Sequence, residues 1–296
     1  MIGFAGRRLA RALVLLVVAL AVVFIVLEFA RAGAPRPDAT DLGLGFAGWL
    51  GGAVIGNFGV SSSQGMSAGN AIAGALAVSA PLVLLGAAIG GLLGGACGVA
   101  AGYRASIGGR VVTVLAQLVE IVPTFWLASM LSLTFGLGLH WFAPGGFVPW
   151  AESPLGATLS LVLPALALGL AVAAPLTRIV RDAVARARAE SPRLAGAARR
   201  LSADEAFHRY GRRRALIDIA KRLAPLVAAL IAGSIMVEMA FSLPGLGRLL
   251  ITAALARDVV LLRGGLLVLI VVVVVLQAVL RIIAGWIDPR IRRTAV

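Results

Sequence analysis

The chain has 296 residues and is poor in the side chains on which many soluble enzymes depend. Only 14% of its residues are charged, against about a quarter in an ordinary soluble domain, which excludes that class. Cys97 is the only cysteine, so the chain can form neither an intramolecular disulfide nor a cysteine-based metal cluster. The only lysine, Lys221, is followed by Arg222. The sequence therefore lacks the Gly-Lys-Ser/Thr end of a P-loop and cannot hydrolyse ATP by that route.

Hydrophobic residues are abundant instead. They make up 60% of the chain, and the mean hydropathy is +0.99. The net charge is +14, but the basic residues lie in clusters separated by long stretches without them. This pattern is typical of a membrane protein, and it makes nucleic-acid binding a poor explanation of the high pI.

Six mainly apolar stretches are long enough to cross a bilayer, which takes about 17 to 25 residues of helix. Because backbone in lipid must be hydrogen-bonded internally, we predict an all-α polytopic membrane protein with about six transmembrane helices. The stretches are residues 12–30, 71–102, 111–137, 155–177, 223–241 and 264–287. The first follows Arg7, Arg8 and Arg11 and lacks a small-residue cleavage site, so we expect an uncleaved anchor.

The distribution of Lys and Arg predicts the orientation. With the N-terminus inside, 21 basic residues fall in inner segments and five in outer ones. Since positively charged short loops stay cytoplasmic, both termini are predicted to be cytoplasmic. The largest polar feature, residues 178–222, is then predicted to be a cytoplasmic loop. His140 and His208 would lie on opposite sides of the membrane, which leaves no histidine pair for a metal site or a histidine-dependent protease.

Small residues recur every four positions in the second stretch, at Gly86, Gly90, Gly94, Gly98 and Gly102. Glycine at this spacing lets another helix approach closely, because helix association in lipid depends on van der Waals contact. We expect the seam to serve packing within the chain rather than a subunit interface.

Two carboxylates fall within the predicted spans, Glu120 in the third and Glu238 in the fifth. A charged carboxylate costs about 2.5 to 3.5 kcal/mol at the bilayer centre, so each is expected to face protein or water. A packed, hydrogen-bonded role is favoured over proton coupling, because the sequence shows no intramembrane basic residue as a relay partner. The run from Ser61 to Ser63 is interpreted as a flexible outer loop rather than a nucleophile. No catalytic or metal-binding residue is predicted.

A stretch near the C-terminus carries a family resemblance. It runs Val237-Glu238-Met239-Ala240-Phe241-Ser242-Leu243-Pro244-Gly245-Leu246-Gly247-Arg248-Leu249-Leu250, and is followed by Ala256-Arg257-Asp258 and Asp288-Pro289-Arg290-Ile291-Arg292. Together with Gly56-Asn57-Phe58-Gly59, Val122-Pro123-Thr124-Phe125-Trp126-Leu127 and Leu163-Pro164-Ala165-Leu166, this resembles inner-membrane permeases of peptide-type ABC importers. The similarity is greatest to the oligopeptide and dipeptide permease B type. The resemblance implies an outer-gate or structural motif at Glu238, Pro244, Gly245, Gly247, Arg257 and Asp258.

The resemblance also implies a coupling helix that docks on a separate ATPase. The family pattern Glu-Ala-Ala-x-x-x-Gly matches Glu205, Ala206 and Gly211 but has Phe207 at the second alanine. A competing register uses Ala197, Leu201 and Ser202, with Arg200 in place of a glycine. The ATPase-coupling segment therefore departs from the family in either register.

The domain organisation implied is an N-terminal helix and outer segment over residues 1–70, a type I ABC permease domain over 71–287 and a cytoplasmic tail over 288–296. Such a permease lies in the bacterial inner membrane and pairs with a second permease, two ATP-binding subunits and an extracytoplasmic substrate-binding protein. ATP and Mg would be held by the ATPase partner, and this chain would hold no cofactor. Peptides are the implied substrate class, with no substrate-binding residue identified. An ATPase-independent membrane scaffold and an ion-coupled secondary transporter remain alternatives.

Overall fold

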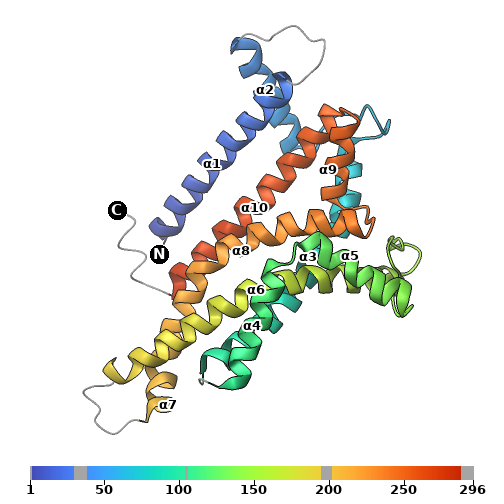
Figure 1. The fold of residues 1–296 in the computed structure, drawn as a ribbon. Coiled ribbons are helices and arrows are strands. Elements are labelled where there is room, and N and C mark those ends of the chain that lie inside the picture. Colours follow the sequence, from blue (N-terminus) through green and yellow to red (C-terminus); the bar gives the residue numbers. More distant parts are fainter. Residues whose placement is uncertain (1, 30–38, 104–105, 195–201, 288–296) are drawn as a thin grey trace. The chain divides into compact units, whose positions relative to one another are not determined.

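Helices make up nearly all of the structure, a computed structural model that describes residues 2–29, 39–103, 106–194 and 202–287 (Figure 1). Across the described residues the only β feature is a single bridge between Val60 and Ser67. The α-helices are α1 (Ile2–Phe29), α2 (Ala39–Val54), α3 (Ala68–Tyr103), α4 (Ile107–Ile121), α5 (Thr124–Leu131), α6 (Pro154–Leu194), α7 (Ala203–Ala206), α8 (Arg212–Ala240), α9 (Leu246–Leu255) and α10 (Val259–Ile287). Two π-helical segments, η1 (Ser132–Gly138) and η2 (Phe207–Gly211), follow α5 and α7.

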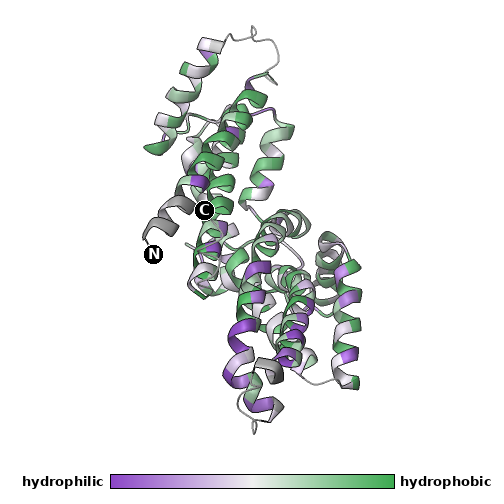
Figure 2. Cartoon of the chain, turned by 90° about the vertical axis from the view of Figure 1, so that its left-hand side faces the viewer, coloured by the Kyte–Doolittle hydropathy of each residue, from purple (hydrophilic) through white to green (hydrophobic). Residues whose placement is uncertain are grey.

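The helices confirm the predicted all-α membrane architecture. Within the described residues, five helices are long and apolar enough to cross a membrane: α1, α3, α6, the helix from Asp204 to Ala240, and α10. The third predicted span, residues 111–137, corresponds to α4 together with α5 and η1, which are long and apolar enough only as a bent pair. Figure 2 shows hydrophobic residues along most of the helices, with hydrophilic ones gathered on the arginine-rich ends of α6 and α8.

This third span is sharply broken, although the sequence suggested one helix. The axes of its two halves differ by 101°. Pro123 has no backbone N–H, and its ring disfavours helical geometry in the preceding residue. Val122 is accordingly extended, with φ −74° and ψ 123°. Pro123 therefore ends α4 and starts a new helix instead of merely kinking one.

The chain folds as two compact units. The first consists of Met1–Ala80 and Ser242–Ala278, and the second of Pro81–Phe241 and Val279–Val296. The core of the first unit joins three helices, with Ala68, Ile72 and Ala75 of α3 packed against Leu246, Leu250 and Ala253 of α9 and Leu261 of α10. An aromatic cluster of Phe24, Phe46 and Trp49 joins α1 to α2 in the same unit.

The helix α2 lies in the part of the chain for which only an outer segment was predicted. Its sequence is rich in glycine, which lowers helix propensity by about 1 kcal/mol per residue relative to alanine. Local propensity therefore argues against a helix here. The rings of Phe46 and Trp49 pack on Phe24 of α1, and this tertiary contact supports the helix that the composition disfavours.

The glycine seam of α3 faces α6 inside the second unit. A Cβ atom on Gly86, Gly90, Gly94 or Gly98 would come within 2.5 to 2.9 Å of α6 atoms, too close for real side chains. The neighbouring Gly91 and Gly95 have nothing within 4 Å. The four-residue spacing thus brings one face of α3 into backbone contact with α6.

The seam also shows that α3 and α6 run in the same direction. From Gly86 to Gly98 the contacts on α6 advance from Leu168 to Val180, so both helices progress together. Two parallel spans require one return crossing between them, and the bent pair α4 and α5–η1 is the described segment that can supply it. This arrangement supports six crossings.

The segment predicted as a cytoplasmic loop, residues 178–222, is mostly helical where the structure describes it, and we call its helical parts, in α6 and from α7 to α8, the hairpin. α6 continues to Leu194 and α8 already begins at Arg212. The two helices pack along each other (Figure 1) around a core of Leu176, Val180, Ala183, Val184, Ala187, Phe207 and Ala215. The many charged residues of this segment indicated that it lies outside the membrane. Its apolar residues nevertheless recur at helical spacing, and they bury one face of each helix.

Candidate functional site

The candidate coupling segment begins with a capping box that the sequence analysis missed. The backbone N–H and the hydroxyl of Ser202 both donate to Glu205 Oε2 at 2.8 Å, and the Glu205 N–H donates to Ser202 Oγ at 3.2 Å. The pattern Ser-x-x-Glu that produces this box is present at residues 202–205 and is a signature of a helix start. Ser202 and Glu205 therefore start α7, and residues 203–240 then continue without a non-helical break.

Phe207, the residue that departs from the family pattern, points into the protein. It is 6% exposed, and its ring meets the Tyr103 ring edge-on at 5.5 Å. Gly211 lies beside it: a Cβ there would be 2.5 Å from the Phe207 ring and from Ser191 Oγ of α6. Glycine at 211 and phenylalanine at 207 therefore fit each other, and the departure lies on the buried face of the segment.

Arg188 of α6 ties the same segment to the rest of the second unit. Its guanidinium donates to Asp204 Oδ1 at 2.5 Å and to the Tyr103 carbonyl, and it lies 4.2 Å from the centre of the Tyr103 ring. The Tyr103 hydroxyl is in turn 3.3 Å from His208 Nε2. These contacts attach the start of α7 to the C-terminal ends of α3 and α6.

Two further ion pairs cross the hairpin. Arg186 pairs with Asp218 at 2.6 Å, and Arg214 pairs with Glu190 at 2.8 Å. Both are partly exposed, and such pairs contribute about 0 to 1 kcal/mol each, so their main effect is to fix the register of α6 against α8. The hairpin is therefore held as one element around a buried core.

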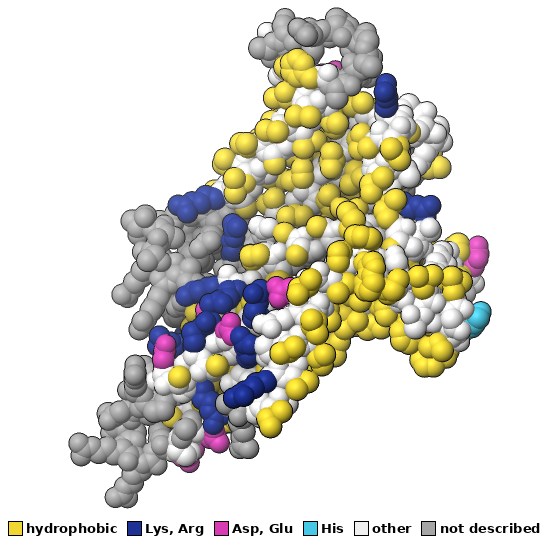
Figure 3. Space-filling view, viewed as in Figure 1, with side chains coloured by type: hydrophobic (Ala, Val, Ile, Leu, Met, Phe, Trp, Pro, Cys, Tyr) yellow, Lys and Arg dark blue, Asp and Glu magenta, His cyan; other side chains and the backbone are white. Residues whose placement is uncertain are grey.

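The outward face of the segment consists of Glu205, His208, Arg209 and Tyr210, all exposed, while Ala206 is 1% exposed. Figure 3 shows Lys and Arg side chains gathered over this hairpin. Of the predicted coupling residues, the structure thus turns Ala206, Phe207 and Gly211 inward and leaves Ser202 and Glu205 accessible. Ala197 and Leu201 of the competing register lie outside the described residues.

Asp258 forms the centre of a second site, in the first unit. It is fully buried. Its Oδ2 accepts hydrogen bonds from Ser61 Oγ at 2.6 Å, from the Ser63 N–H at 2.9 Å and from Ser63 Oγ at 2.8 Å. Its Oδ1 accepts the N–H of Leu261 at 3.0 Å and so caps the first turn of α10.

These contacts correct the interpretation of residues 61–63 as a flexible loop. Ser61 is 1% exposed, and its backbone N–H donates to the Met66 carbonyl at 2.9 Å. Burial raises the pKa of Asp258, but the hydrogen bonds from Ser61, Leu261 and Ser63 outweigh it and hold the pKa well below the ordinary value. The carboxylate therefore stays ionised and joins the loop before α3 to the start of α10.

The motif residues upstream of Asp258 set the start of α9. Gly245 is the N-cap, and the N–H of Leu246 donates to the buried Ser79 Oγ of α3 at 2.7 Å. Gly247 is buried in the first turn, and Pro244 is exposed just before it. Glu238, near the end of α8 in the second unit, is 1% exposed. Within the first unit, the motif residues Gly245 and Gly247 thus form the start of α9, whereas Glu238 is a buried carboxylate of the second unit.

Arg257 has a backbone role. Its φ is 56°, in the left-handed region. The Asp258 N–H donates to the Ala253 carbonyl at 2.9 Å and the Arg257 N–H to the Ala254 carbonyl at 3.1 Å, which is a Schellman ending of α9. Glycine usually occupies this position because it has no Cβ.

Replacing Arg257 by glycine is expected to raise the free energy of unfolding by about 1 kcal/mol, since the left-handed strain disappears. Arg257→Ala is the matched control: it removes the exposed side chain but keeps the Cβ, so we expect no gain. Thermal unfolding of the purified chain in detergent measures both. A gain in Arg257→Ala equal to that in Arg257→Gly would show that the side chain, and not the backbone, is responsible.

Glu120 has a basic partner that the sequence did not reveal. Arg178 of α6 donates to Glu120 Oε1 of α4 at 2.7 Å. Both side chains are partly exposed within the second unit, at 49% and 33%. The pairing favours the packed, hydrogen-bonded role for Glu120. Nothing in it indicates a chain of proton carriers.

Fold and site together define a polytopic helical membrane protein with an arginine-rich helical hairpin and a separately capped helix α9. Its residues 94–293 match the family model of the binding-protein-dependent transport system inner membrane component, and the chain belongs to this family. It is therefore an inner-membrane permease subunit of an importer. Such permease components are not themselves catalytic.

Several curated proteins are similar over most of their length. The chain is 34% identical over 261 residues to a putative peptide transport system permease protein of Brucella abortus, covering 88% of this chain and 82% of that protein. It is 31% identical over 324 residues to the oligopeptide transport system permease protein OppB of Mycobacterium bovis, covering 99% of each. OppB of Haemophilus influenzae is 29% identical over 182 residues, covering 62% of this chain and 58% of that protein.

Proposed function

We propose that the chain forms half of a translocation pathway that imports peptides by alternating access. The names of the relatives support the substrate class, since the proteins of Brucella abortus and Mycobacterium bovis are called peptide and oligopeptide permeases. A second, similar permease supplies the other half, and an extracytoplasmic protein delivers the substrate. ATP and Mg are bound by two ATPase subunits, while both termini of this chain lie in the cytoplasm.

The observation that carries the proposal is the direction of Phe207. A bulky residue in place of alanine would weaken docking if it stood on the contact face, but this ring is buried against Tyr103. The outward residues Glu205, Arg209 and Tyr210 remain available to an ATPase groove. Arginine and tyrosine are the residue types that most often dominate binding energy at interfaces.

The hairpin explains how docking reaches the membrane helices. Residues 203–240 continue without a non-helical break, so a force on residues 205–210 acts directly on the fifth span. Arg188 and the buried contact of Phe207 with Tyr103 pass the same force to the ends of α6 and α3. Closure of the ATPase pair would thus tilt several spans together, which is the movement that alternating access requires.

Arg209→Glu is expected to reduce the amount of P-loop ATPase that co-purifies with the tagged chain by about tenfold or more, as for an interface arginine that contributes about 2 kcal/mol. The tagged chain is purified from its native membrane in mild detergent, and the co-purifying proteins are quantified by mass spectrometry. A point substitution is sharper than deletion of residues 203–214, because the deletion would also remove the first turn of α8.

Arg110→Glu is the matched control. It reverses the same charge on an exposed residue of α4, on the same proposed side of the membrane. Retention of the ATPase by Arg209→Glu at the level of Arg110→Glu would contradict docking through this face. Absence of any ATPase from the unaltered complex under several detergents would favour the scaffold alternative.

A further inference from the structure

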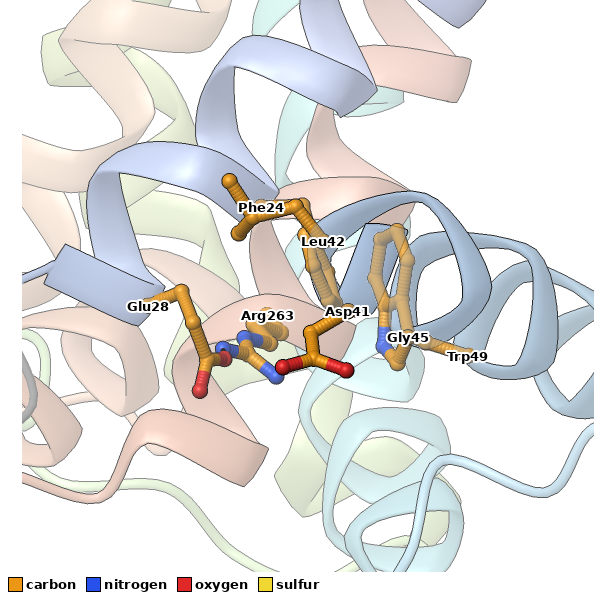
Figure 4. A pocket seen from close by; sticks show the side chains of 7 residues that line it. All are labelled: Phe24, Glu28, Asp41, Leu42, Gly45, Trp49 and Arg263. Atoms are coloured by element: carbon orange, nitrogen blue, oxygen red, sulfur yellow. Dashed lines mark hydrogen bonds and ion pairs between the residues drawn. The ribbon is translucent and has the colours of Figure 1, made fainter. Parts of the chain in front are cut away.

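A half-open cavity of about 270 Å³, with charged and apolar groups in its lining, lies in the first unit among α1, α2 and the start of α10. Its lining includes Phe24, Glu28, Asp41, Gly45, Trp49 and Arg263. Figure 4 shows the carboxylates of Glu28 and Asp41 on either side of the Arg263 guanidinium, with the Trp49 indole beside them. None of these residues belongs to the coupling segment or to the Asp258 site.

The cavity contains donors that have no acceptor. Among the described residues, the buried Nε1 of Trp49 and Nε of Arg263 have no hydrogen-bond partner, although another nitrogen of Arg263 is paired with Glu28. A buried donor without an acceptor costs about 1 to 3 kcal/mol, so such groups are rare in folded proteins. Two of them lining one cavity indicate that an acceptor oxygen of a ligand completes the site.

The charges of the cavity restrict that ligand further. The lining carries two carboxylates, Glu28 and Asp41, and one guanidinium, Arg263, so its formal charge is −1. A simple anion such as free phosphate would be repelled by this balance. A ligand that carries both a cation and an acceptor oxygen matches the acidic and the donor groups together.

The surroundings favour the headgroup of a lipid. Glu28 lies in the last turn of α1 and Arg263 in the second turn of α10, so the cavity is near one end of two predicted spans. On its opposite face α1 exposes Val22 and Val26, so the helix beside the cavity presents apolar surface to acyl chains. The volume suits a small headgroup, since sites for whole drug-sized ligands run from about 300 to 1,000 Å³.

Two properties distinguish a primary ammonium from choline. A primary ammonium has three N–H donors for the carboxylates of Glu28 and Asp41, whereas a trimethylammonium has none. Choline is usually bound by aromatic faces, but the Arg263 guanidinium already lies 4.4 Å from the centre of the Phe24 ring. We propose that this cavity binds a phospholipid with a primary-ammonium headgroup, of the phosphatidylethanolamine type, with phosphate oxygens accepting from Trp49 and Arg263.

Native mass spectrometry of the purified full chain tests this directly. The chain is titrated with phosphatidylethanolamine, phosphatidylcholine and phosphatidylglycerol that share the same acyl chains. We expect about tenfold tighter binding of the ethanolamine lipid than of either other lipid, which corresponds to one lost charge-assisted hydrogen bond. Equal binding of the ethanolamine and choline lipids would overturn the proposal.

Two substitutions locate the site. Trp49→Phe removes the indole donor and keeps a ring, and Asp41→Asn removes one charge from an exposed position, so neither is expected to unfold the chain. Each is expected to weaken ethanolamine-lipid binding about tenfold. Trp126→Phe and Glu152→Gln are the controls, since both residues belong to the second unit and neither lines the cavity. Unchanged binding in both cavity variants would overturn the assignment, and the measurement needs no ATPase, so it is independent of the coupling proposal.

Discussion

Gly98→Ala is expected to lower the free energy of unfolding by about 2 to 3 kcal/mol, and Gly98→Leu to leave little folded protein. A Cβ at this position would lie 2.5 Å from Val180 Cβ and 2.8 Å from the Thr177 carbonyl oxygen of α6. Neither is the flexible end of a long side chain, so the two helices would have to move apart. Because attraction between helices in lipid depends on close contact, a small separation forfeits much of it.

Gly95→Ala provides the control within the same helix. Gly95 has nothing within 4 Å, so alanine there meets no obstacle and should change stability by less than about 1 kcal/mol. Size-exclusion profiles after heating, followed by intrinsic fluorescence in detergent, measure both variants. An equal loss of stability in Gly98→Ala and Gly95→Ala would mean that glycine is needed for helix flexibility and not for contact with α6.

Asp258→Ala is expected to lower the free energy of unfolding by about 3 kcal/mol or more. The substitution removes the acceptor of Ser61, of Ser63 and of the Leu261 N–H within a buried site. Each buried donor left without a partner costs about 1 to 3 kcal/mol. Limited proteolysis between α2 and α3 should detect release of the loop that Asp258 holds. Ser62→Ala, at an exposed neighbouring position, should leave the protease pattern unchanged.

The low pKa of Asp258 makes a pH prediction with a definite sign. A carboxyl group whose pKa is lower in the folded state stabilises the fold above its unfolded pKa, about 3.9, and loses this contribution as the pH falls through the folded value. The stability difference between the natural chain and Asp258→Asn should therefore stay constant from about pH 8 to pH 5. A difference that already shrinks between pH 7 and pH 5 would contradict an ionised, hydrogen-bonded Asp258.

Several features of this permease follow from local sequence alone. The apolar stretches predicted the spans because the length and hydropathy needed to cross a bilayer are properties of consecutive residues. The four-residue spacing of Gly86, Gly90, Gly94 and Gly98 marked one face of a helix for the same reason. The motif from Glu238 to Asp258 indicated the family, and the match over residues 94–293 confirmed it. The capping box at Ser202 and Glu205 was equally local and could have been predicted.

Other features depended on contacts between distant residues. Ser61 and Asp258 are 197 positions apart, so no spacing rule could join them or show that residues 61–63 are held in place. Arg178 lies 58 positions from Glu120, and its pairing is set by the packing of α4 on α6. The 101° break at Pro123 exceeds what proline alone requires, since proline excludes one hydrogen bond and one conformation but does not choose the direction of the next helix.

The coupling segment shows most clearly which features follow from local sequence and which depend on packing. The sequence determined that residues 205–211 resemble a coupling helix with phenylalanine in place of an alanine. It could not determine on which face that phenylalanine lies, because the face depends on where Tyr103 and α6 are. Only the tertiary structure placed Phe207 inward against Tyr103 and Gly211, and left Glu205, Arg209 and Tyr210 outward. Local composition thus determined which segments are helical and apolar, whereas packing decided which side of each helix is exposed.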